Sequence, residues 1–317
     1  MNLTASSLGI AAVAGYIPES FLDNLERAPA LDASEDLLRD KIGVLKVTRK
    51  PADEETSGMA VKAIRKLVDQ GAVRLEDVDC LVVVTQNPDG YGLPHTSARV
   101  HGALGLSTRC AVFDISLGCS GYVYGLSIIT ALMQAQGLRC GLLVTADPYS
   151  KIIDPHDRNT SLLFGDAAAA TLITDQPVWR IGRFDLGSDG SFADDLMVRP
   201  HSQHFHMNGR AVLNFSSRKV PESILNALAV NGVALAEVDR FLLHQGSRHV
   251  VHQIGKKLGV PDEKVPFWAG EYGNTVSSSI PLLLTHDSLR DDRCLVLSGF
   301  GVGISWGSTV LWRVRAG

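Results

Sequence analysis

The sequence predicts an α/β protein made of two copies of one α/β unit, with largely parallel sheets covered by helices on both faces. Segments 58–79 and 218–239 share a helical pattern, a glycine stop and a turn, and an apolar strand follows each of them. Further along, the strand pattern CGLLV at 140–144 recurs as CLVLS at 294–298. Each half then ends in glycine-broken strands. This shared order is too extensive for a chance resemblance of two short units, and the repeat is too long for a solenoid.

The first half, residues 1–175, is predicted to follow the order βαβαβαββ. In order, the expected elements are a strand at 8–16, a helix within 58–79, a strand at 80–86, a helix ending in HGALGL (101–106), a strand at 111–117, a helix at 120–135, a strand at 140–144 and glycine-broken strands at 164–173. The helix at 120–135 is apolar on nearly every side, which indicates a buried helix.

The second half, residues 176–317, is predicted to repeat that order. Its helix within 218–239 precedes the strand RFLLHQ at 240–245, and GKKLGV at 255–260 matches HGALGL in the first half. The strand at 294–298 and the segment SWGSTVLW at 305–312 complete the unit. We therefore expect two βαβαβαββ halves that meet around a pseudo-twofold axis.

Composition narrows the function. The net charge of −4 and the isoelectric point near 6.2 argue against nucleic acid or a membrane surface as the main partner. The five cysteines are far apart and form no CxxC pair, so we expect reduced thiols in the cytoplasm rather than disulfides or a zinc site. The N-terminus lacks the basic region of a signal peptide, and no segment has the length of a transmembrane helix without charges.

The segment DISLGCSGYVYGL, residues 114–126, carries the first candidate functional residue. Gly118 allows a tight turn from the buried strand into the buried helix, and Cys119 lies at the start of that helix. Unpaired N–H groups and the helix dipole at this end stabilise a thiolate. A free cysteine is equally often a small buried side chain that only packs. The segment alone leaves both interpretations open.

The second half supplies candidate partners for the cysteine. His244 ends the apolar strand of FLLHQGS, where the first half has Val84, and Asn274 lies in GEYGNTVSSSIP before a helix of small residues. The chain then ends with the glycine-rich turn of SGFGVGISWGS. A pseudo-twofold axis would bring the start of the Cys119 helix to face His244 and Asn274.

Taken together, these motifs resemble the β-ketoacyl-acyl-carrier-protein synthase III (KAS III) family of thiolase-fold condensing enzymes. The similarity covers nearly the whole chain and includes FGDAAAA (164–170), MNGRAVLNF (207–215) and the motifs around the three candidate residues. It implies a thiolase-like fold, a five-layer αβαβα sandwich. Elongating synthases pair the cysteine with two histidines, so Asn274 favours the initiating type.

The resemblance also implies a two-step reaction. Cys119 would accept an acyl group from a thioester of coenzyme A (CoA) or acyl carrier protein (ACP), with the backbone N–H groups of Cys119 and Val302 as the oxyanion hole. A malonyl thioester on ACP would then lose carbon dioxide, and His244 and Asn274 would stabilise its enolate. No metal or redox cofactor is needed for this chemistry.

Further binding residues follow from the resemblance. Arg158, in DPHDRNT, matches a position near the nucleotide end of CoA, and Leu93 matches a loop residue that reaches into the partner's acyl pocket in homodimeric relatives. An acidic carrier needs a basic rim, and the candidates are Arg210, Arg218, Lys219, Arg248, Lys256 and Lys257. The alternative is an ordinary solvated surface. We expect a homodimer.

The sequence also departs from the family pattern. Leu37 and Lys41 stand where familiar members have the tryptophan and arginine that clamp the adenine of CoA, and Ser247 replaces the asparagine of HQAN. These changes weaken the case for acetyl-CoA as the acyl donor. The main alternative is therefore an acyltransferase that acts on a hydroxyl or amine without decarboxylation, and a less favoured one is a non-catalytic partner subunit.

A cluster of three histidines, His201, His204 and His206, lies in HSQHFHMN. A metal site is one interpretation of such a cluster. No nearby cysteine or carboxylate completes a ligand set, so we interpret the segment as a surface loop.

Overall fold

The computed structural model describes residues 8–314 and contains the predicted order in its first half. The elements of this order are β1 (Gly9–Tyr16), α2 (Thr56–Asp69), β4 (Cys80–Val84), α3 (Thr96–Leu104), β5 (Ala111–Ile115), α4 (Gly121–Gln136), β6 (Cys140–Ala146) and β7 (Ala168–Thr174). β7 ends close to the proposed boundary between the halves at 175/176, and the next strand begins at Trp179.

The second half repeats the order with one element missing. It contains β8 (Trp179–Ser188), α6 (Gly209–Asn231), β11 (Arg240–Leu243), α7 (Arg248–Leu258), α8 (Ser279–Leu283), β12 (Cys294–Gly301) and β13 (Ser305–Arg313). Within the described residues no strand lies between α7 and α8, where the repeat predicts one. Pro266 has no N–H to donate to a sheet there. The backbone of Gly270 and Tyr272 instead accepts hydrogen bonds from the amides of Leu45 (2.8 Å) and Thr48 (3.2 Å) of the first half.

Shorter elements fill the connections. After β1 lie β2 (Phe21–Asp23), α1 (Asn24–Arg27), η1 (Ala28–Leu31), the π-helix η2 (Leu37–Ile42) and β3 (Lys46–Thr48); η4 (Tyr149–Lys151) and α5 (Arg158–Ser161) follow β6. After β8 lie η5 (Gly190–Asp195), β9 (Leu196–Val198) and β10 (Phe205–Met207). The remaining 3₁₀ turns are η3 (Leu75–Asp77), η6 (Leu235–Glu237), η7 (Asp262–Lys264), η8 (Ala269–Glu271), η9 (Val276–Ser278) and η10 (Asp287–Leu289).

The main strands form a sheet in the order β11-β12-β13-β8-β1-β7-β6-β4-β5. Within residues 8–314, β1 and β8 pair through Gly9 and Ile10 opposite Arg180 and Trp179, so the described strands of the two halves are joined along a short seam. The ladders β4–β5, β4–β6 and β11–β12 are parallel. β7 and β13 run against the other strands of their halves. Each half is therefore largely parallel, as the sequence predicts.

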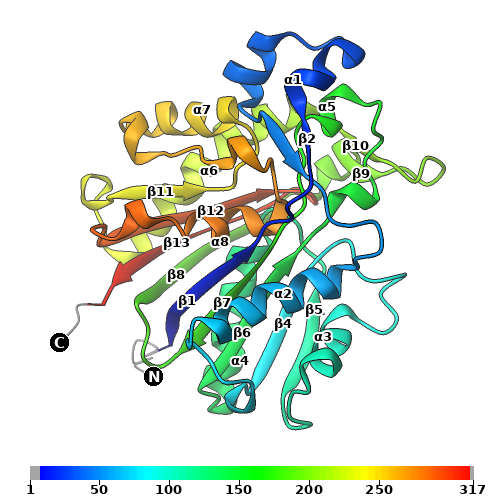
Figure 1. The fold of residues 1–317 in the computed structure, drawn as a ribbon. Helices are drawn as coiled ribbons and strands as arrows, with labels where there is room; N and C mark the ends of the chain where they lie inside the picture. The colour runs from blue at the N-terminus through cyan, green and yellow to red at the C-terminus, as the bar shows by residue number, and fades with distance from the viewer. Residues whose placement is uncertain (1–7, 315–317) are drawn as a thin grey trace.

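The side chains of the strands divide between separate cores, which defines five layers. Figure 1 shows α2 lying across the strands of the first half. Along β4, Leu81 and Val83 pack with α2, whereas Val82 and Val84 pack with the buried helix α4. This alternation is the two-residue period of a strand covered on both faces. On the far side, α6 and α7 cover the second half of the sheet. The predicted αβαβα sandwich is confirmed, with α4 and α8 as its central layer.

The duplication extends to single hydrogen bonds. In the first half, the Asp79 carboxylate accepts from the Arg139 and Cys140 amides at 2.8 and 3.0 Å. Asp239, its counterpart in the second half, accepts from the amides of Arg293 and Cys294 at 2.7 and 2.9 Å. In both halves this carboxylate fixes the start of an inner strand, which explains why both copies of the repeat end in aspartate.

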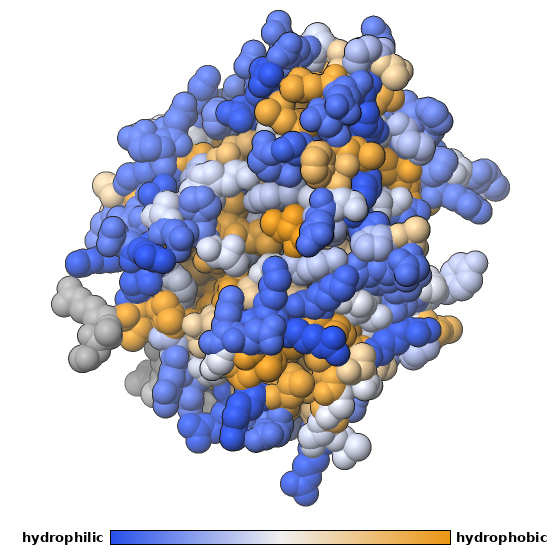
Figure 2. All heavy atoms as spheres, in the orientation of Figure 1, coloured by the Kyte–Doolittle hydropathy of each residue, from blue (hydrophilic) through white to orange (hydrophobic). Residues whose placement is uncertain are grey.

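The surface is mainly hydrophilic on the face that Figure 2 shows, with separate apolar patches between the charged side chains. The longest helix, α6, carries Arg210, Arg218, Lys219 and Glu222. Within residues 8–314, no helix has the length and apolar character needed to cross a membrane.

Candidate active site

Cys119 lies in the turn between β5 and α4, where the chain has little room. A Cβ on Gly118 would lie 2.5 Å from the Gln86 side-chain oxygen, and one on Gly121 would lie 2.4 Å from Val84. A larger residue at either position would require these neighbouring side chains to shift, so the glycines on both sides of Cys119 and Ser120 suit the tight turn. Cys119 itself is 6% exposed and precedes Ser120, the N-cap of α4. Its sulfur therefore lies at the positive end of a 16-residue helix.

The turn between β12 and β13 approaches Cys119 from the other half of the molecule. A Cβ on Gly301 would lie 2.8 Å from the Cys119 sulfur, so the approach depends on glycine here. The backbone N–H groups of Val302 and of Cys119 hydrogen-bond the sulfur and act to lower its pKa. These are the two donors that the resemblance assigns to an oxyanion hole.

His244 follows β11 directly and is 3% exposed. Its amide donates to the Ser298 carbonyl at 2.8 Å, which extends the β11–β12 ladder to the histidine backbone. Its ring Nδ1 lies 2.8 Å from the Ser279 hydroxyl, and the Phe300 ring meets it edge-on at 5.5 Å. The serine hydroxyl can donate or accept, so it holds the imidazole in either tautomer.

Asn274 is fixed by the backbone of the first half. Its N–H donates to the Leu163 carbonyl at 2.8 Å, and its carbonyl accepts from the Gly165 amide at 3.0 Å. Its side-chain oxygen accepts from the Val276 amide at 2.9 Å, which leaves the Nδ2 group 3.5 Å from Nε2 of His244. The two nitrogens are close enough to donate to one oxygen placed between them.

Val276 aligns both of these side chains through its backbone. Its φ of +54° lies in the left-handed region, which costs a β-branched residue about 1–3 kcal/mol. Besides the bond to Asn274, the Val276 backbone hydrogen-bonds His244 and acts to raise its pKa. The backbone of the strained Val276 thus holds, through hydrogen bonds, the two polar side chains that face Cys119.

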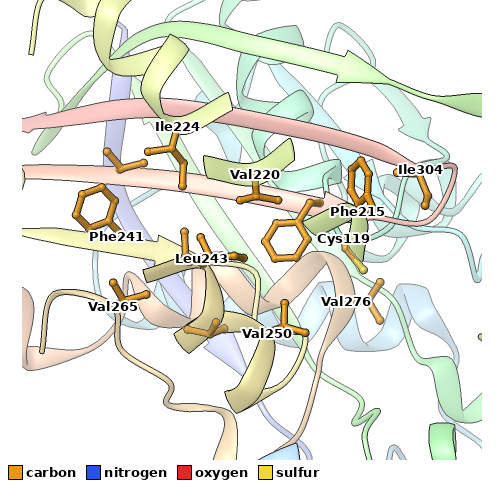
Figure 3. Close-up of a cluster of buried hydrophobic side chains, with 14 of the residues drawn as sticks. Cys119, Phe215, Val220, Ile224, Phe241, Leu243, Val250, Val265, Val276 and Ile304 are labelled. Carbon is orange, nitrogen blue, oxygen red and sulfur yellow. The ribbon is translucent and has the colours of Figure 1, made fainter. Parts of the chain in front are cut away.

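The three residues line one cavity of about 120 Å³. Its walls are otherwise largely apolar and are formed by Leu163, Phe164, Leu196, Phe205, Met207, Gly209, Val212, Gly246, Ser247, Val250, Phe300, Gly301 and Val302. Figure 3 shows Cys119 at the end of the adjoining apolar cluster, between Phe215 and Val276. A buried apolar cavity with a thiol and a few convergent polar groups has the character of an enzyme active site.

Burial sets the charge of the resting site. It raises the pKa of Cys119 to about 12, and the nearby charge of Asp147 adds to this effect against the two backbone donors. Burial also lowers the pKa of His244 to about 3. The stabilisation of a thiolate by the helix start, which the sequence suggests, is therefore outweighed. Near pH 7 the resting site therefore holds a neutral thiol and a neutral imidazole.

Comparison with known proteins matches both halves of this site. Residues 113–190 fit the family model of 3-oxoacyl-[acyl-carrier-protein] synthase III, and residues 228–312 fit that of its C-terminal part. The β-ketoacyl-[acyl-carrier-protein] synthase III of Lactococcus lactis subsp. lactis is 33% identical over 95% of this chain and 98% of its own. The chain belongs to the 3-oxoacyl-[acyl-carrier-protein] synthase III family.

Other synthase III proteins agree with this assignment. The Acidiphilium cryptum enzyme is 32% identical over 94% of this chain and 97% of its own. The crystal structure of the Pseudomonas aeruginosa PAO1 synthase III superposes with a TM-score of 0.89 and 32% identity, covering 98% and 99% of the two chains. The chain thus has the thiolase-like fold and belongs to a family of condensing enzymes of the acyltransferase class in fatty acid biosynthesis.

The six basic residues predicted for carrier binding lie on two neighbouring helices. Arg210 is the second residue of α6 and Arg248 is the first of α7, each beside a residue that lines the synthase cavity. Arg248 is half-buried with its guanidinium over the Phe267 ring, and Lys219 is paired with Glu222 at 3.0 Å. Arg218, Lys256 and Lys257 are exposed. Only Arg210 and Arg248 therefore lie beside the cavity, whereas Arg218 and Lys219 lie further along α6 and Lys256 and Lys257 lie in the last turn of α7.

The other predicted binding residues lie away from the cavity walls. Arg158 donates to the Asp32 carbonyl at 2.6 Å and lies 3.7 Å from its carboxylate. Lys41 is exposed and Leu37 half-buried on η2, which packs on α7. Leu93 is 89% exposed on the loop between β4 and α3. The sequence does not indicate the hydrogen bond from Arg158 to the Asp32 carbonyl, because it depends on the left-handed conformation of Asp32 at the end of η1.

The histidine cluster is a surface feature in this synthase. His201 and His204 are exposed between β9 and β10, and His206 is half-buried in β10. His204 lies 3.9 Å from the Asp154 carboxylate. Over residues 8–314, no group of three or more histidine, cysteine, aspartate or glutamate side chains is placed to hold a metal ion.

Sequence reasoning missed three buried polar residues of the site. Ser279 contacts His244, Tyr149 packs beside Cys119, and Asp147 follows the buried strand β6. The Asp147 carboxylate accepts from the Gln86 amide at 3.1 Å and from the Asn87 side chain at 2.9 Å. An acidic residue directly after an apolar strand was the available signal.

Asp147→Asn is expected to stabilise the protein above pH 7. Burial raises the pKa of Asp147 to about 7 from an unfolded value of 3.8, so the folded state binds the extra proton between these values. The bound proton therefore adds to the free energy of unfolding at low pH, and this stabilisation is lost as pH rises from about 4 to 7. Asparagine keeps an acceptor oxygen without the charge. Urea unfolding at pH 4 and pH 8 should show a gain of at most about 4 kcal/mol at pH 8 alone.

The comparison with wild type isolates Asp147 from the histidine of the site. His244, with a pKa lowered to about 3, has the opposite effect because the unfolded state binds its proton. That effect is present in both proteins and cancels in the difference. A variant that is destabilised equally at both pH values would show that the hydrogen bonds of Asp147 matter and its charge does not.

Proposed function

We propose that Cys119, His244 and Asn274 catalyse the condensing reaction of this synthase. The observation that supports this most directly is their convergence on one buried cavity, with the Val302 amide directed at the thiol. The three come from separate elements of both halves. A set of cysteine, histidine and asparagine aimed at one apolar space provides a nucleophile, a base and two donors for an oxyanion.

In the first step the Cys119 sulfur attacks the carbonyl carbon of an acyl thioester. The neutral His244 takes the thiol proton, and the Cys119 and Val302 amides stabilise the oxyanion. The intermediate collapses with loss of the donor thiolate, which takes the proton from His244. The acyl group is then held as a thioester on Cys119.

In the second step a malonyl thioester on ACP enters the same cavity. Its thioester oxygen lies between Nε2 of His244 and Nδ2 of Asn274, which are 3.5 Å apart and stabilise the enolate formed as carbon dioxide leaves. The enolate carbon attacks the acyl-cysteine, the bond between the acyl carbon and the Cys119 sulfur breaks, and the released thiolate takes a proton from solvent. The product is a β-ketoacyl thioester, and the residues present require neither metal nor redox cofactor for these steps.

The substrates are proposed to arrive as CoA or ACP thioesters, and the active form as a homodimer. Tyr91 and Leu93 are 101% and 89% exposed on the loop after β4, and the sheet ends at β5, whose outer edge is unpaired within residues 8–314. An open edge strand beside exposed apolar side chains is suited to pairing with a second copy. Leu93 would then reach the partner's acyl pocket.

Intact-protein mass after mixing with acyl-CoA or acyl-ACP tests the function. A mass gain that disappears with malonyl-ACP and yields a β-ketoacyl product supports the proposal. An adduct that ignores malonyl-ACP but transfers to an alcohol or amine would favour the acyltransferase alternative. No adduct with any donor would leave the partner-subunit alternative. Native mass spectra of the same samples report whether the protein is a dimer.

The Lys256→Glu/Lys257→Glu double variant is expected to lower kcat/KM for malonyl-ACP by roughly tenfold. Both lysines are exposed in the last turn of α7, so reversing them weakens attraction of an acidic carrier without disturbing the cavity. Steady-state kinetics with malonyl-ACP measures this effect, and a malonyl thioester of CoA is the control substrate. An equal loss with both substrates would contradict a docking role.

A further inference from the structure

Asp147 is a fully buried carboxyl group that takes no part in the steps of the proposed reaction. It follows β6 directly, and its Oδ1 atom accepts from the Gln86 amide and the Asn87 side chain. Its Oδ2 atom is buried without a hydrogen-bond partner among the described residues, and so is the Ser277 hydroxyl. The Ser277 hydroxyl nevertheless acts to lower the pKa of the carboxyl. An unpartnered carboxyl oxygen and an unpartnered hydroxyl are thus left to satisfy each other.

On one side, Asp147 is connected to the turn that carries Cys119. The Gln86 amide donates to Asp147, and the side-chain oxygen of Gln86 accepts from the Tyr149 hydroxyl at 3.1 Å. That side-chain oxygen also packs closely against Gly118, the residue before Cys119. Because interiors are closely packed, a displacement of Asp147 would move Gln86 and, through it, the nucleophile turn.

On the other side, Asp147 approaches η9. Ser277 lies in η9 directly after Val276, whose backbone hydrogen-bonds both Asn274 and His244. A second contact, between a hydroxyl of β6 and a hydroxyl of η9 that lie 2.8 Å apart, joins the same two elements. The end of β6 is therefore tied to the turn that aligns the two enolate donors.

The charge of Asp147 also reaches the nucleophile. Two titratable groups respond to it: the carboxylate raises the pKa of the Cys119 thiol at the start of α4 and of the Tyr149 phenol in η4. The side chains that bind Asp147 from the loop after β4 and from η9 are neutral. The pKa of His244 follows from its burial and from the Val276 backbone. Burial raises the pKa of Asp147 to about 7, so its charge changes near neutral pH.

We propose that Asp147 is a positioning residue for both steps of the reaction: as a neutral acid it joins the Cys119 turn to η9, and as a carboxylate it opposes loss of the thiol proton. This inference rests on the proposed function. Acylation places negative charge on the Cys119 sulfur and then on the oxyanion beside it, so a carboxylate nearby slows that step. Relative to a variant that lacks this charge, wild type should acylate more slowly as pH rises through 7.

The test is the ratio of acylation rates of Asp147→Asn and wild type from pH 5.5 to 8.5, measured with acetyl-CoA by intact-protein mass. Asparagine resembles the neutral acid in shape and can donate to Ser277. The ratio should lie within about threefold of one at pH 5.5 and rise to roughly tenfold at pH 8.5, with a midpoint near 7. A purely structural role would change stability to urea but leave this ratio independent of pH, and that result would overturn the inference.

Two further variants test the connections of Asp147. Asp147→Ala removes the acceptor of Gln86 and should slow both acylation and decarboxylation of malonyl-ACP at least about tenfold. Unchanged decarboxylation in this variant would contradict the link to η9. Ser277→Ala should move the midpoint of the pH dependence to higher pH, because the serine hydroxyl acts to lower the pKa of Asp147. A midpoint that stays or falls would contradict the pairing of the two side chains.

Asp239→Asn is a matched control. One oxygen of Asp239 also accepts from two amides, at 2.7 and 2.9 Å, but its charge acts on the Cys294 thiol. This variant should keep the wild-type pH dependence of acylation. Alkylation of Cys119 by iodoacetamide, measured by peptide mass, repeats the comparison without an acyl donor. A pH-dependent alkylation ratio without any acyl adduct would support the effect of Asp147 on the thiol and contradict the proposed function.

Discussion

Cys119→Ala is expected to abolish acyl transfer, with kcat reduced at least about a thousandfold and no acyl adduct in the intact mass. Alanine fits the site because Cys119 is small and buried, and the contacts that its sulfur loses are those with the backbone N–H groups of Val302 and of Cys119 itself. The cavity, the Val302 amide and the pair of His244 and Asn274 are expected to be retained. Malonyl-ACP decarboxylation should therefore persist in this variant, since the enolate is stabilised by groups other than the thiol.

Cys294 offers a matched control for this experiment. It is buried at the start of β12, and burial raises the pKa of its thiol to about 11, so it shares the chemical character of Cys119 without facing the cavity. Cys294→Ala should acylate at the wild-type rate. An adduct that persists in Cys119→Ala and disappears in Cys294→Ala would mean that Cys294, and not Cys119, is the nucleophile. Unfolding by urea shows whether both variants remain folded.

The convergence of Cys119, His244 and Asn274 could be predicted because each follows a local pattern. Cys119 follows an apolar strand and a glycine in the first half, and His244 ends the apolar strand of the second half that matches the one ending at Val84. Repetition of the α/β unit then brings the ends of these elements together. Periodicity and the repeat therefore predicted two α/β halves covered by helices on both faces, whereas the five-layer arrangement followed from the family resemblance.

The parts that could not be predicted depend on contacts between distant segments. The strand missing before α8 is an example, because the backbone of this segment bonds to residues after β1 rather than to its own half. Tyr149 is another, since nothing in its surrounding sequence shows that Phe164 and Phe205 meet it. The pKa of Cys119 depends on a balance between burial and two backbone donors, one of them from the opposite half.

Asn274→Ala and His244→Ala are expected to separate the two half-reactions. Loss of either side chain removes one of two donors to the enolate oxygen, which should slow decarboxylation of malonyl-ACP by about 10²- to 10³-fold. Asn274 takes no part in deprotonating Cys119, so Asn274→Ala should acylate within a few-fold of wild type and accumulate the acyl-enzyme. In the proposed mechanism His244 accepts the proton in the first step, so its loss should slow acylation as well. Rapid-quench mass spectrometry of each step measures these rates.

Ser279→Ala tests whether the role of His244 in catalysis depends on the orientation of its ring. The serine hydroxyl, 2.8 Å from Nδ1, is the polar side chain that holds the ring, yet it lies on the side away from Asn274. Its loss leaves both enolate donors in place, so the rate of decarboxylation should fall less than in His244→Ala and the pH dependence of the step should shift with the altered imidazole.

Equal losses of both steps in Asn274→Ala would mean that the asparagine supports the fold of the site rather than the enolate. Acylation that is unchanged in His244→Ala would remove the histidine from the first step and require another base for the thiol proton.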